Sequence, residues 1–301
     1  MTRMALRPRT SCPLCGNTGK TTLISLPFES DPVAEFLARY YKGRVEMAAL
    51  KNGQYVIDRC QRCSGMWQRE ILDDAGMSDL YERWISPDGS RSRRANAGLA
   101  LQYARHCARL LRLLPDPGSR TLLDYGMGWG DWCAMTQSFG FRVHGVELSQ
   151  ERIAHARTLG IPCSGPEDIP QGPYDFLYLE QVLEHVPDPR AVMTAMMPRL
   201  KPSGYVHIGV PDASAVPSKA NNPTALLRKG PAQPLEHINL FTKQSLTRFM
   251  HSFGCVPARQ HEGLLRVAPP GQFIKDIVLT CARLLPAGMF PPGTSQLFRK
   301  S

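Results

Sequence analysis

From residue 120 onward, short apolar runs alternate with segments that repeat apolar residues at helical spacing. The apolar runs predict strands, and they cover residues 121–125, 142–146, 176–179 and 205–210. The intervening segments predict helices over residues 131–139, 150–159, 191–200 and 242–253. Because strands that alternate with helices form parallel sheets, we expect an α/β fold with a doubly wound, Rossmann-like sheet.

The first 118 residues follow other patterns. Residues 54–58 read as a polar strand, and residues 71–85 and 97–114 read as helices, the second of which ends at Pro115-Asp116-Pro117-Gly118. We therefore predict three domains: a small module over residues 1–70, a helical linker or lid over residues 71–118, and the α/β domain over residues 119–301.

Two later segments carry expectations of their own. Residues 211–234 are rich in Pro, Asn, Ser and Lys, which predicts a mobile loop over a site. Residues 272–285 predict a closing helix that packs on the domain, with binding to a membrane surface as the alternative.

Composition is that of an ordinary globular protein, with 43% hydrophobic and 21% charged residues in 301. No apolar stretch approaches the roughly 20 residues that a membrane-spanning helix needs. The basic first ten residues run into Ser11-Cys12-Pro13 rather than an apolar segment, which does not fit a signal peptide. The expected location is the cytoplasm.

A formal net charge of +10 raises the question of anionic partners. Eight arginines lie between Arg83 and Arg120, against Asp88 and Asp116. A solvated helix surface explains such a run, and a patch that attracts an anionic substrate is the alternative. Because no RNA-binding signature accompanies the charge, nucleic acid is not expected, and a small or lipid-linked acceptor, anionic ones included, is favoured.

The motif with the most chemical content is a strand that runs into three alternate glycines and then a helix, Asp124-Tyr125-Gly126-Met127-Gly128-Trp129-Gly130. Glycines let the backbone approach a ligand at the strand end, and the helix N-terminus offers unpaired N–H donors to a carboxylate. An acidic residue about 20 positions later can hold ribose hydroxyls, and Glu147 stands 21 residues after Gly126.

A dinucleotide-binding loop would require glycine at position 131, where this chain has Asp131. The observed spacing instead resembles class I S-adenosylmethionine-dependent methyltransferases. The resemblance continues through residues 174–189, 199–206 and the block His237-Ile238-Asn239-Leu240-Phe241-Thr242, and it covers roughly residues 120–258.

This resemblance implies that S-adenosylmethionine is the cofactor. By family analogy, its contacts are Asp124, Gly126, Gly128, Gly130, Glu147 and Glu180. The family often has Asp after the third strand, near the adenine, where this chain has Gly165. Asp168 is the expected substitute, with Glu167 as the alternative.

Nine cysteines scattered at random would give about a quarter of one Cys-x-x-Cys pair, yet two such pairs occur in the first 63 residues. Two short thiolate loops complete a tetrahedron around zinc and leave no open position, so Cys12, Cys15, Cys60 and Cys63 predict a structural zinc site. Unligated or redox-active cysteines are the alternative.

A similar N-terminal arrangement occurs in a methyltransferase subgroup that includes deoxysugar C-methyltransferases. The chain resembles that subgroup over roughly residues 12–258, without the further C-terminal domain typical of it.

Two histidines follow carboxylates, in Glu184-His185 and Glu236-His237. A neighbouring carboxylate can orient a histidine and stabilise its charged form. In the sugar methyltransferases that this chain resembles, a Glu-His pair in the late block serves as the base, which implies His237 supported by Glu236. His185 falls where relatives have a histidine that lines the site. A hydrogen-bonded structural histidine is the alternative for both.

The function expected from these features is methyl transfer from S-adenosylmethionine to a small or lipid-linked acceptor, a sugar or other hydroxylated metabolite. O-methylation of a quinone or polyketide-type phenol is the alternative, because the segment around Leu183–Val186 also resembles such enzymes. A non-catalytic binding module with a vestigial cofactor fold is the second alternative. The acceptor atom and the oligomeric state do not follow from the sequence.

Overall fold

The computed structural model describes residues 6–85, 97–227, 230–258 and 294–300, so the helix predicted over 272–285 lies outside it. The chain divides into two compact units, each assembled from separate stretches of sequence. The first unit consists of residues 1–92, 181–194 and 210–253, and the second of residues 93–180, 195–209 and 254–301. Among the described helices, none is long and apolar enough to cross a membrane.

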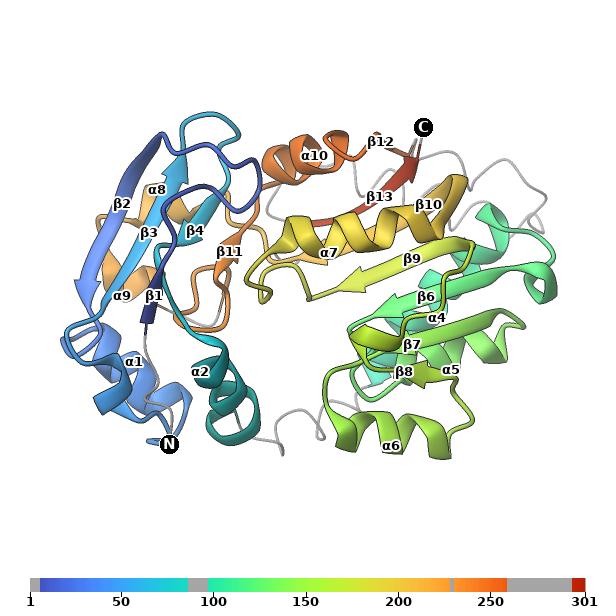
Figure 1. Ribbon diagram of the computed structural model, residues 1–301, viewed down its shortest axis with the longest axis horizontal. Helices are drawn as coiled ribbons and strands as arrows, with labels where there is room; N and C mark the ends of the chain where they lie inside the picture. The colour runs from blue at the N-terminus through green and yellow to red at the C-terminus, as the bar shows by residue number, and fades with distance from the viewer. Residues whose placement is uncertain (1–5, 86–96, 228–229, 259–293, 301) are drawn as a thin grey trace. The chain divides into compact units, whose positions relative to one another are not determined.

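The second unit contains a seven-stranded sheet in the order β12-β13-β10-β9-β6-β7-β8 (Figure 1). Strands β10, β9, β6, β7 and β8 pair in parallel, and β12 pairs with β13 antiparallel. The strands are β6 (Thr121–Tyr125), β7 (Arg142–Val146), β8 (Cys163–Ser164), β9 (Tyr174–Glu180), β10 (Leu200–Val210), β12 (Cys255–Pro257) and β13 (Thr294–Lys300). The predicted doubly wound, Rossmann-like sheet is confirmed.

The strand order reverses at β6, which pairs with β7 on one side and β9 on the other. In open α/β sheets, ligands bind beyond the carboxyl ends of the strands at such a reversal. The helices that follow the sheet strands are α5 (Asp131–Ser138), α6 (Gln150–Thr158), α7 (Pro189–Met196) and the 3-10 turns η5 (Pro166–Asp168) and η6 (Met197–Arg199).

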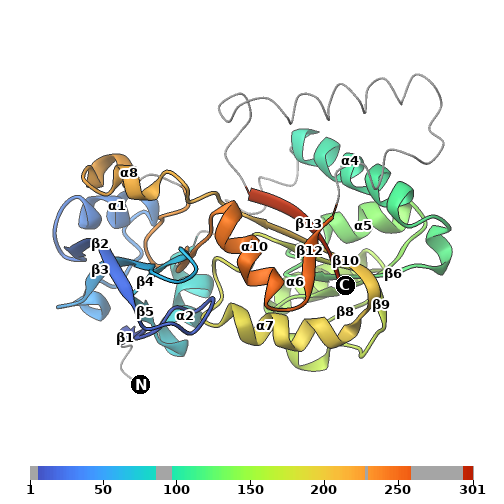
Figure 2. The same ribbon diagram turned by 90° about the horizontal axis from the view of Figure 1, so that it is seen from above.

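Helix α4 (Ala97–Leu113) precedes β6 after the turn η4 (Pro117–Ser119), and it lies beside α5 on one face of the sheet (Figure 2). Leu110 and Leu114 pack with Trp132 of α5 and with Leu122 and Phe176 of the sheet. This apolar core fixes the strand ends that carry the candidate cofactor residues.

The first unit is built on a four-stranded antiparallel sheet, β11-β4-β3-β2, with a two-stranded sheet of β1 and β5 (Figure 1). These strands are β1 (Leu6–Pro8), β2 (Lys20–Pro27), β3 (Gln54–Cys60), β4 (Met66–Gln68), β5 (Glu70–Leu72) and β11 (Asn239–Leu240). Strand β11 comes from the late sequence block and pairs with β4, Asn239 opposite Trp67. The block 237–242 therefore contributes a strand to the same sheet as the N-terminal strands β2, β3 and β4.

The helices of the first unit are α1 (Val33–Tyr40), the turn η1 (Met47–Leu50), α2 (Asp74–Asp79), the π-helical turn η2 (Leu80–Trp84), α8 (Val216–Lys219), α9 (Pro223–Leu226) and α10 (Lys243–His251). The helix predicted over residues 71–85 is wrong at its start. Ile71 and Leu72 pair with β1 instead, and the helix begins after Asp73, whose carboxylate accepts from the Gly76 amide at 2.8 Å.

The mobile loop predicted over residues 211–234 is also wrong for the part described. Its apolar side chains, among them Ala213, Val216 and Leu227, are buried in the core of the first unit with Phe28 and Tyr55. Buried apolar area opposes detachment of the segment from that core.

The domain boundaries predicted at residues 70 and 118 differ from the two observed units. Met77, Leu80 and Trp84 belong to the core of the first unit, whereas Leu110 and Leu114 belong to that of the second. The predicted linker is thus shared between two cores, and its role as a lid stays a prediction.

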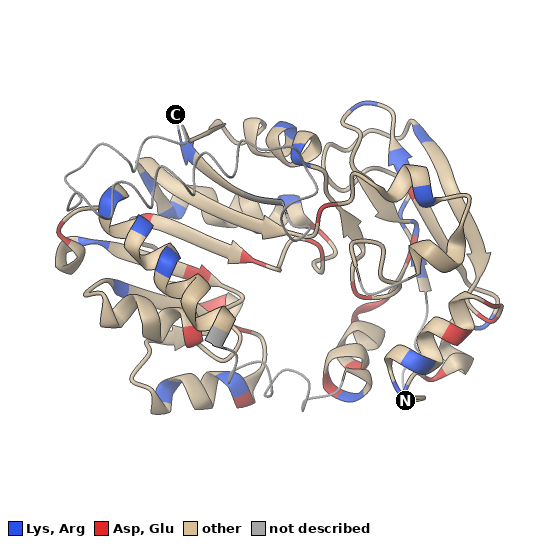
Figure 3. Cartoon of the chain, turned by 180° about the vertical axis from the view of Figure 1, so that it is seen from behind, with Lys and Arg blue, Asp and Glu red and all other residues tan. Residues whose placement is uncertain are grey.

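Basic residues are distributed over several helices and strands, with Arg105, Arg109 and Arg112 along α4 (Figure 3). Arg83 is paired with Asp79 at 2.9 Å and with Glu46, and Arg120 is paired with Asp175 at 3.2 Å. These two members of the arginine run therefore have acidic partners within their own units, and arginines 91, 93 and 94 lie outside the described residues.

Candidate functional site

The glycine loop after β6 has the backbone geometry that its sequence predicts. Gly126, Gly128 and Gly130 have φ values of +83°, +58° and +84°. Residues with side chains rarely adopt this conformation. At Gly130 a Cβ atom would also lie 2.7 Å from the Ile161 side chain. The turn therefore requires glycine both for conformation and for space.

Glu147, directly after β7, forms a hydrogen bond with the glycine loop. One carboxylate oxygen accepts from the Gly128 amide at 3.0 Å, and the other accepts from the amides of Leu148 at 2.9 Å and Ser149 at 3.1 Å. The side chain is therefore fixed where the carboxyl end of β7 meets the glycine loop. Leu148 beside it is 75% exposed, an apolar surface at the strand end that the sequence analysis did not single out.

Asp124, near the carboxyl end of β6, is buried. The Cys133 thiol donates to its Oδ2 at 3.3 Å. Burial, with a smaller contribution from the negative charges of Glu147 and Glu180, raises the pKa of Asp124 to about 7. A positively charged ligand group nearby would favour the ionised form.

Glu180, at the carboxyl end of β9, accepts a hydrogen bond from His207 Nε2 at 2.9 Å. The contact depends on Gly209, which pairs with Glu180 in the sheet, because a Cβ there would lie 1.9 Å from Glu180 Oε2. The His207 ring stacks on Tyr178 with centroids 4.7 Å apart. His207 was not among the predicted site residues, although the strand period places residues 207 and 209 on one face of β10.

Asp168 lies at the end of the turn η5, and its side chain is exposed, as is that of Glu167. Gly165 caps this turn after β8. The adenine-binding role of Asp168 stays a prediction. The structure thus gathers Asp124, Glu147 and Glu180 at the carboxyl ends of neighbouring parallel strands, and acidic residues mark this edge in Figure 3.

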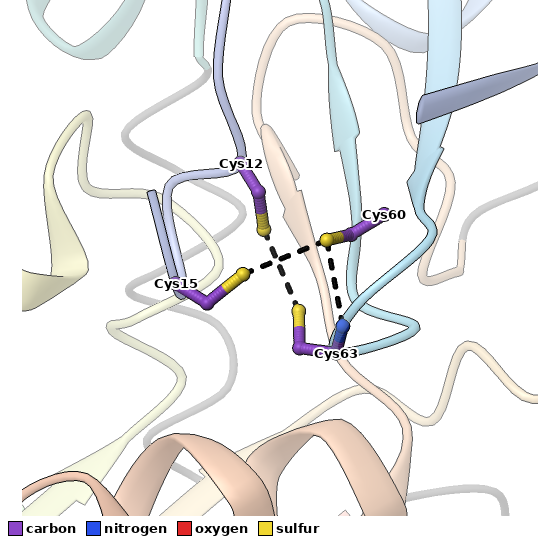
Figure 4. A group of neighbouring side chains, drawn as sticks. All are labelled: Cys12, Cys15, Cys60 and Cys63. Carbon is purple, nitrogen blue, oxygen red and sulfur yellow. Dashed lines mark hydrogen bonds between the residues drawn. The ribbon is translucent and has the colours of Figure 1, made fainter. Parts of the chain in front are cut away.

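The four N-terminal cysteines converge on one point (Figure 4). The Sγ atoms of Cys12 and Cys63 are 3.5 Å apart, and so are those of Cys15 and Cys60. Four thiolates around zinc, with bonds of about 2.3 Å, have sulfur–sulfur distances of about 3.8 Å. The donor set and its spacing therefore fit zinc, whereas a disulfide requires about 2.05 Å.

Backbone amides support the cysteine cluster. The amides of Arg62 and Cys63 donate to Cys60 Sγ at 3.3 and 3.4 Å, and Gly65 donates to Cys63 Sγ at 3.4 Å. Such bonds stabilise thiolates, the form that binds metal. At Gly65 a Cβ would lie 2.4 Å from the Leu14 side chain, so this knuckle needs glycine, as its sequence suggests.

The predicted catalytic histidines form a second cluster, with Glu184, in the first unit. The candidate ligand atoms of Glu184, His185 and His237 all lie within 4.8 Å of one another. His185 Nε2 is 3.8 Å from Glu184 Oε1, and the two imidazole rings have centroids 4.9 Å apart. Burial lowers the pKa of His185 to about 3, and His237 contributes to the shift, so His185 is neutral near pH 7.

Each histidine of this cluster donates from Nδ1 to a backbone carbonyl. His185 Nδ1 bonds Glu236 O at 3.0 Å, and His237 Nδ1 bonds Gly230 O at 2.6 Å. Because a carbonyl only accepts, Nδ1 of each ring carries a proton, and in the neutral His185 ring Nε2 carries the lone pair. Glu236 itself is 8% exposed, and its charge, after burial, raises the pKa of Tyr41.

Asn239 joins the two segments that supply the cluster. Its Nδ2 donates to Leu183 O at 2.8 Å and to Val186 O at 2.7 Å, and its backbone amide donates to Glu184 O at 3.0 Å. Its Oδ1 accepts from the half-buried Arg9 at 2.7 Å. No sequence pattern singled out either role, and no local signal marks Arg9, since its hydrogen-bond partners Gln68, Ile238 and Asn239 lie 59 or more positions away.

Gln68 of β4 also forms hydrogen bonds with the backbone of residues 233–237. Its Nε2 donates to the carbonyls of Gln233 at 2.8 Å and His237 at 3.0 Å, and its Oε1 accepts from the Leu235 amide at 3.3 Å. The backbone around His237 is therefore held by side chains from the N-terminal sheet.

Comparison with known proteins supports one family. A family model described as "Methyltransferase domain" matches residues 99–260, which is more than half of the chain. The match includes the glycine loop, Glu147 and both Glu-His pairs.

Several curated relatives share one activity name. A ubiquinone biosynthesis O-methyltransferase of Paramagnetospirillum magneticum is 31% identical over 145 residues, which are 43% of this chain and 58% of that protein. The corresponding protein of Bradyrhizobium diazoefficiens is 32% identical over 153 residues, 46% of this chain and 60% of that one. The chain thus spans about 60% of the length of these relatives.

Among solved structures, the magnesium protoporphyrin IX methyltransferase of Synechocystis PCC 6803, with bound SAH, is similar with a TM-score of 0.52. The match has 14% sequence identity and covers 76% of this chain and all of that one. At this identity the similarity concerns the fold.

Proposed function

Because the chain belongs to the methyltransferase domain family, we propose that it binds S-adenosylmethionine and transfers its methyl group to a small-molecule acceptor. The observation that carries this proposal is the glycine loop closed on Glu147, with the Gly128 amide 3.0 Å from the carboxylate. A reversal of strand order at β6 puts this loop where doubly wound sheets bind ligands.

The residues at the strand ends match the chemistry of this cofactor. When bound, S-adenosylmethionine supplies a methyl group on a positively charged sulfonium sulfur. Asp124 and Glu180 offer negative charge to its cationic amino-acid end, and Glu147 offers acceptors to its ribose hydroxyls. Leu148 offers an apolar surface to its base. His207 acts here as a positioning residue for Glu180.

The acceptor we favour is a hydroxyl group of a small molecule. The curated relatives named for ubiquinone biosynthesis favour a phenol over the sugar that the late sequence block suggests. Membership of the deoxysugar subgroup rests on the sequence resemblance alone. The non-catalytic alternative predicts that the glycine loop no longer binds the cofactor.

An acceptor hydroxyl that attacks the methyl carbon must lose its proton as the carbon–sulfur bond breaks. His237 can accept that proton on Nε2, because Nδ1 already donates to Gly230 O at 2.6 Å. Glu236 is the proposed support of this base and His185 a residue that lines the acceptor site. For the four thiolates of Cys12, Cys15, Cys60 and Cys63 we propose structural zinc.

An activity screen with labelled S-adenosylmethionine tests the proposal. Catechols and other phenols, nucleotide sugars and lipid extracts are the acceptors, and transfer of label to a phenol supports the preferred reading. Label on a sugar alone would restore the sugar interpretation. Calorimetry with S-adenosylmethionine and no acceptor separates the two enzyme interpretations, phenol and sugar methylation, from the binding-module alternative. That alternative predicts no cofactor binding.

A further inference from the structure

Tyr81 is an exposed aromatic residue in a backbone segment of defined conformation. It lies in the π-helical turn η2, in which the Ile85 amide donates to the Leu80 carbonyl at 2.8 Å. Leu80 and Trp84 anchor this turn with exposures of 0% and 1%, whereas Tyr81 is 42% exposed. Single π-helical turns occur frequently at functional sites. The turn therefore presents the Tyr81 ring at the surface of the first unit.

The Tyr81 ring makes an edge-to-face contact with His185. Their ring centroids are 6.3 Å apart with an interplanar angle of 74°, and the rings of His185 and His237 are 4.9 Å apart at 69°. Such contacts are favourable over centroid distances of about 4.5–7 Å. A chain of ring contacts within the first unit therefore leads from the exposed Tyr81 to His237, the proposed base.

Tyr81 lies outside the apolar core of the first unit. Leu80 and Trp84 belong to that core, and Ile85 packs against it, whereas within the described ranges Tyr81 does not belong to it. Ring area that faces water can be covered by a ligand, which is favourable because apolar surface leaves water. Ligand sites are lined mainly by apolar and aromatic side chains. The features of Tyr81 are those of a residue in a binding site.

The ring that Tyr81 contacts is uncharged and partly accessible. The His185 side chain is 22% exposed and neutral near pH 7, because desolvation lowers its pKa to about 3. Arg83, two positions after Tyr81, already pairs with Asp79 at 2.9 Å. An uncharged aromatic ring packs against such a surface without the loss of hydration that an ion would suffer.

We propose that Tyr81 is a specificity-determining residue of the acceptor site, where it packs against the ring of an aromatic acceptor. This inference deepens the proposed function and rests on it, since His237 is there the group that accepts the proton of the acceptor hydroxyl. An acceptor ring that packs on Tyr81 and His185 extends the chain of ring contacts and brings its hydroxyl toward His237. A sugar has no aromatic face and forgoes the added energy of an aromatic pair, so Tyr81 favours phenols.

Steady-state kinetics of the full-length protein with labelled S-adenosylmethionine and catechol test this role. Tyr81→Leu keeps an apolar side chain but removes the aromatic ring. It should raise the KM for catechol about 3- to 10-fold and change kcat little, because a contact made equally in ground and transition states is lost. Tyr81→Phe keeps the ring and should leave KM within about twofold of the unmodified value.

Glu82→Gln is the matched control, because Glu82 is an exposed neighbour on the same turn. It should change neither KM nor kcat. Equal free energies of unfolding and equal affinities for S-adenosylmethionine in all variants exclude a general loss of structure as the cause of a raised KM. If Tyr81→Leu is unstable, Tyr81→Met carries the test, since its long, flexible side chain also keeps apolar area without a ring.

Two results would overturn the role of Tyr81 and leave the proposed function intact: a KM for catechol unchanged by Tyr81→Leu, or an equal rise in Tyr81→Leu and Tyr81→Phe. Catechol that the unmodified protein neither methylates nor binds, in calorimetry with S-adenosylhomocysteine present, would reject an aromatic acceptor and this inference with it. Calorimetry with S-adenosylmethionine keeps that result apart from a failure of the proposed function, because the cofactor would still bind and another acceptor would still be methylated.

Discussion

The Gly128 amide donates to Glu147 across the carboxyl ends of β6 and β7, at 3.0 Å. The same carboxylate accepts two further backbone amides, so its position is set before any ligand binds. A carboxylate held in this way loses little freedom when it receives ribose hydroxyls.

We expect Glu147→Gln to weaken S-adenosylmethionine binding about 10- to 100-fold, because hydrogen bonds to charged groups contribute about 1.5–3 kcal/mol. Gly128→Val should abolish binding, since its φ of +58° excludes a β-branched residue. Calorimetry measures both, and the surface variant Glu151→Gln serves as the control. Binding of NAD(P) by the unmodified protein, with no response to S-adenosylmethionine, would contradict the assignment of the loop.

Asp124 makes the stability of the second unit depend on pH. Its folded-state pKa of about 7 lies above its unfolded value near 4, so ionisation disfavours the fold. The protein without ligand should therefore lose stability between pH 4 and about pH 7, on the order of 4 kcal/mol at most from this group. Asp124→Asn should remove this slope and be the more stable form at pH 8.

Denaturant unfolding at pH 5 and pH 8 measures the effect. The Cys133 thiol can still donate to the amide oxygen of the variant, so the comparison isolates the charge. Equal stability losses from pH 5 to pH 8 in both proteins would show that Asp124 is not the titrating group.

The cysteine cluster predicts about one zinc ion per chain in protein purified without added metal. Cys12→Ser should lower the zinc content and destabilise the first unit by several kcal/mol, because binding free energy at structural zinc sites contributes to folding. Cofactor affinity should stay within a small factor, since the glycine loop belongs to another core. Cys107→Ser, in α4, is the matched control, and zinc content unchanged by Cys12→Ser would refute the site.

Sequence reasoning succeeded where the signal is local. Strands β6 and β7 begin and end at the predicted residues because each apolar run is bounded by turn residues. The glycine loop and the four cysteines were found by spacing alone. At Ile71 and Leu72 the apolar pattern suggested a helix, but β1, more than 60 positions earlier, pairs with them as a strand.

The contacts that hold the site are long-range and had no local signal. The pair of Glu180 and His207 depends on the register of β9 and β10 and on the missing side chain of Gly209. Asn239 belongs to the block 237–242, which resembles a known family. Its hydrogen bonds to Leu183 and Val186, however, follow only from the fold. The Pro-rich composition of residues 211–234 suggested a mobile loop. The apolar residues of this segment are few and irregularly spaced, so their burial in the core does not follow from the sequence pattern.

His237 is expected to be essential for turnover as the proposed base. His237→Ala should lower kcat by about 10²- to 10⁴-fold while cofactor affinity changes little. Loss of the base should also flatten the acidic limb of the pH profile of kcat/KM, whereas loss of a residue that only positions the acceptor should lower the profile without changing its shape. Near-normal turnover of His237→Ala on the correct acceptor would exclude this role and leave His185 as the candidate.

Asn239 should matter more for stability than any surface asparagine. It is 1% exposed, and its side chain bonds two carbonyls and Arg9. Asn239→Ala leaves these buried groups without their partner, which costs about 1–3 kcal/mol for each unsatisfied group. Asn239→Asp should be worse, because a carboxylate cannot donate to the carbonyls of Leu183 and Val186.

Asn222→Ala is the control for this comparison, since Asn222 only caps the short helix α9 and is exposed, and it should cost about 1 kcal/mol. Denaturant unfolding of the three variants gives the free energies, and turnover reports the histidine cluster that Asn239 positions. If Asn239→Ala is no less stable than Asn222→Ala, the bonds of Asn239 do not hold residues 183–186 to the late segment. In that case the positions of Glu184 and His185 must depend on packing alone, and both variants of Asn239 should keep full turnover.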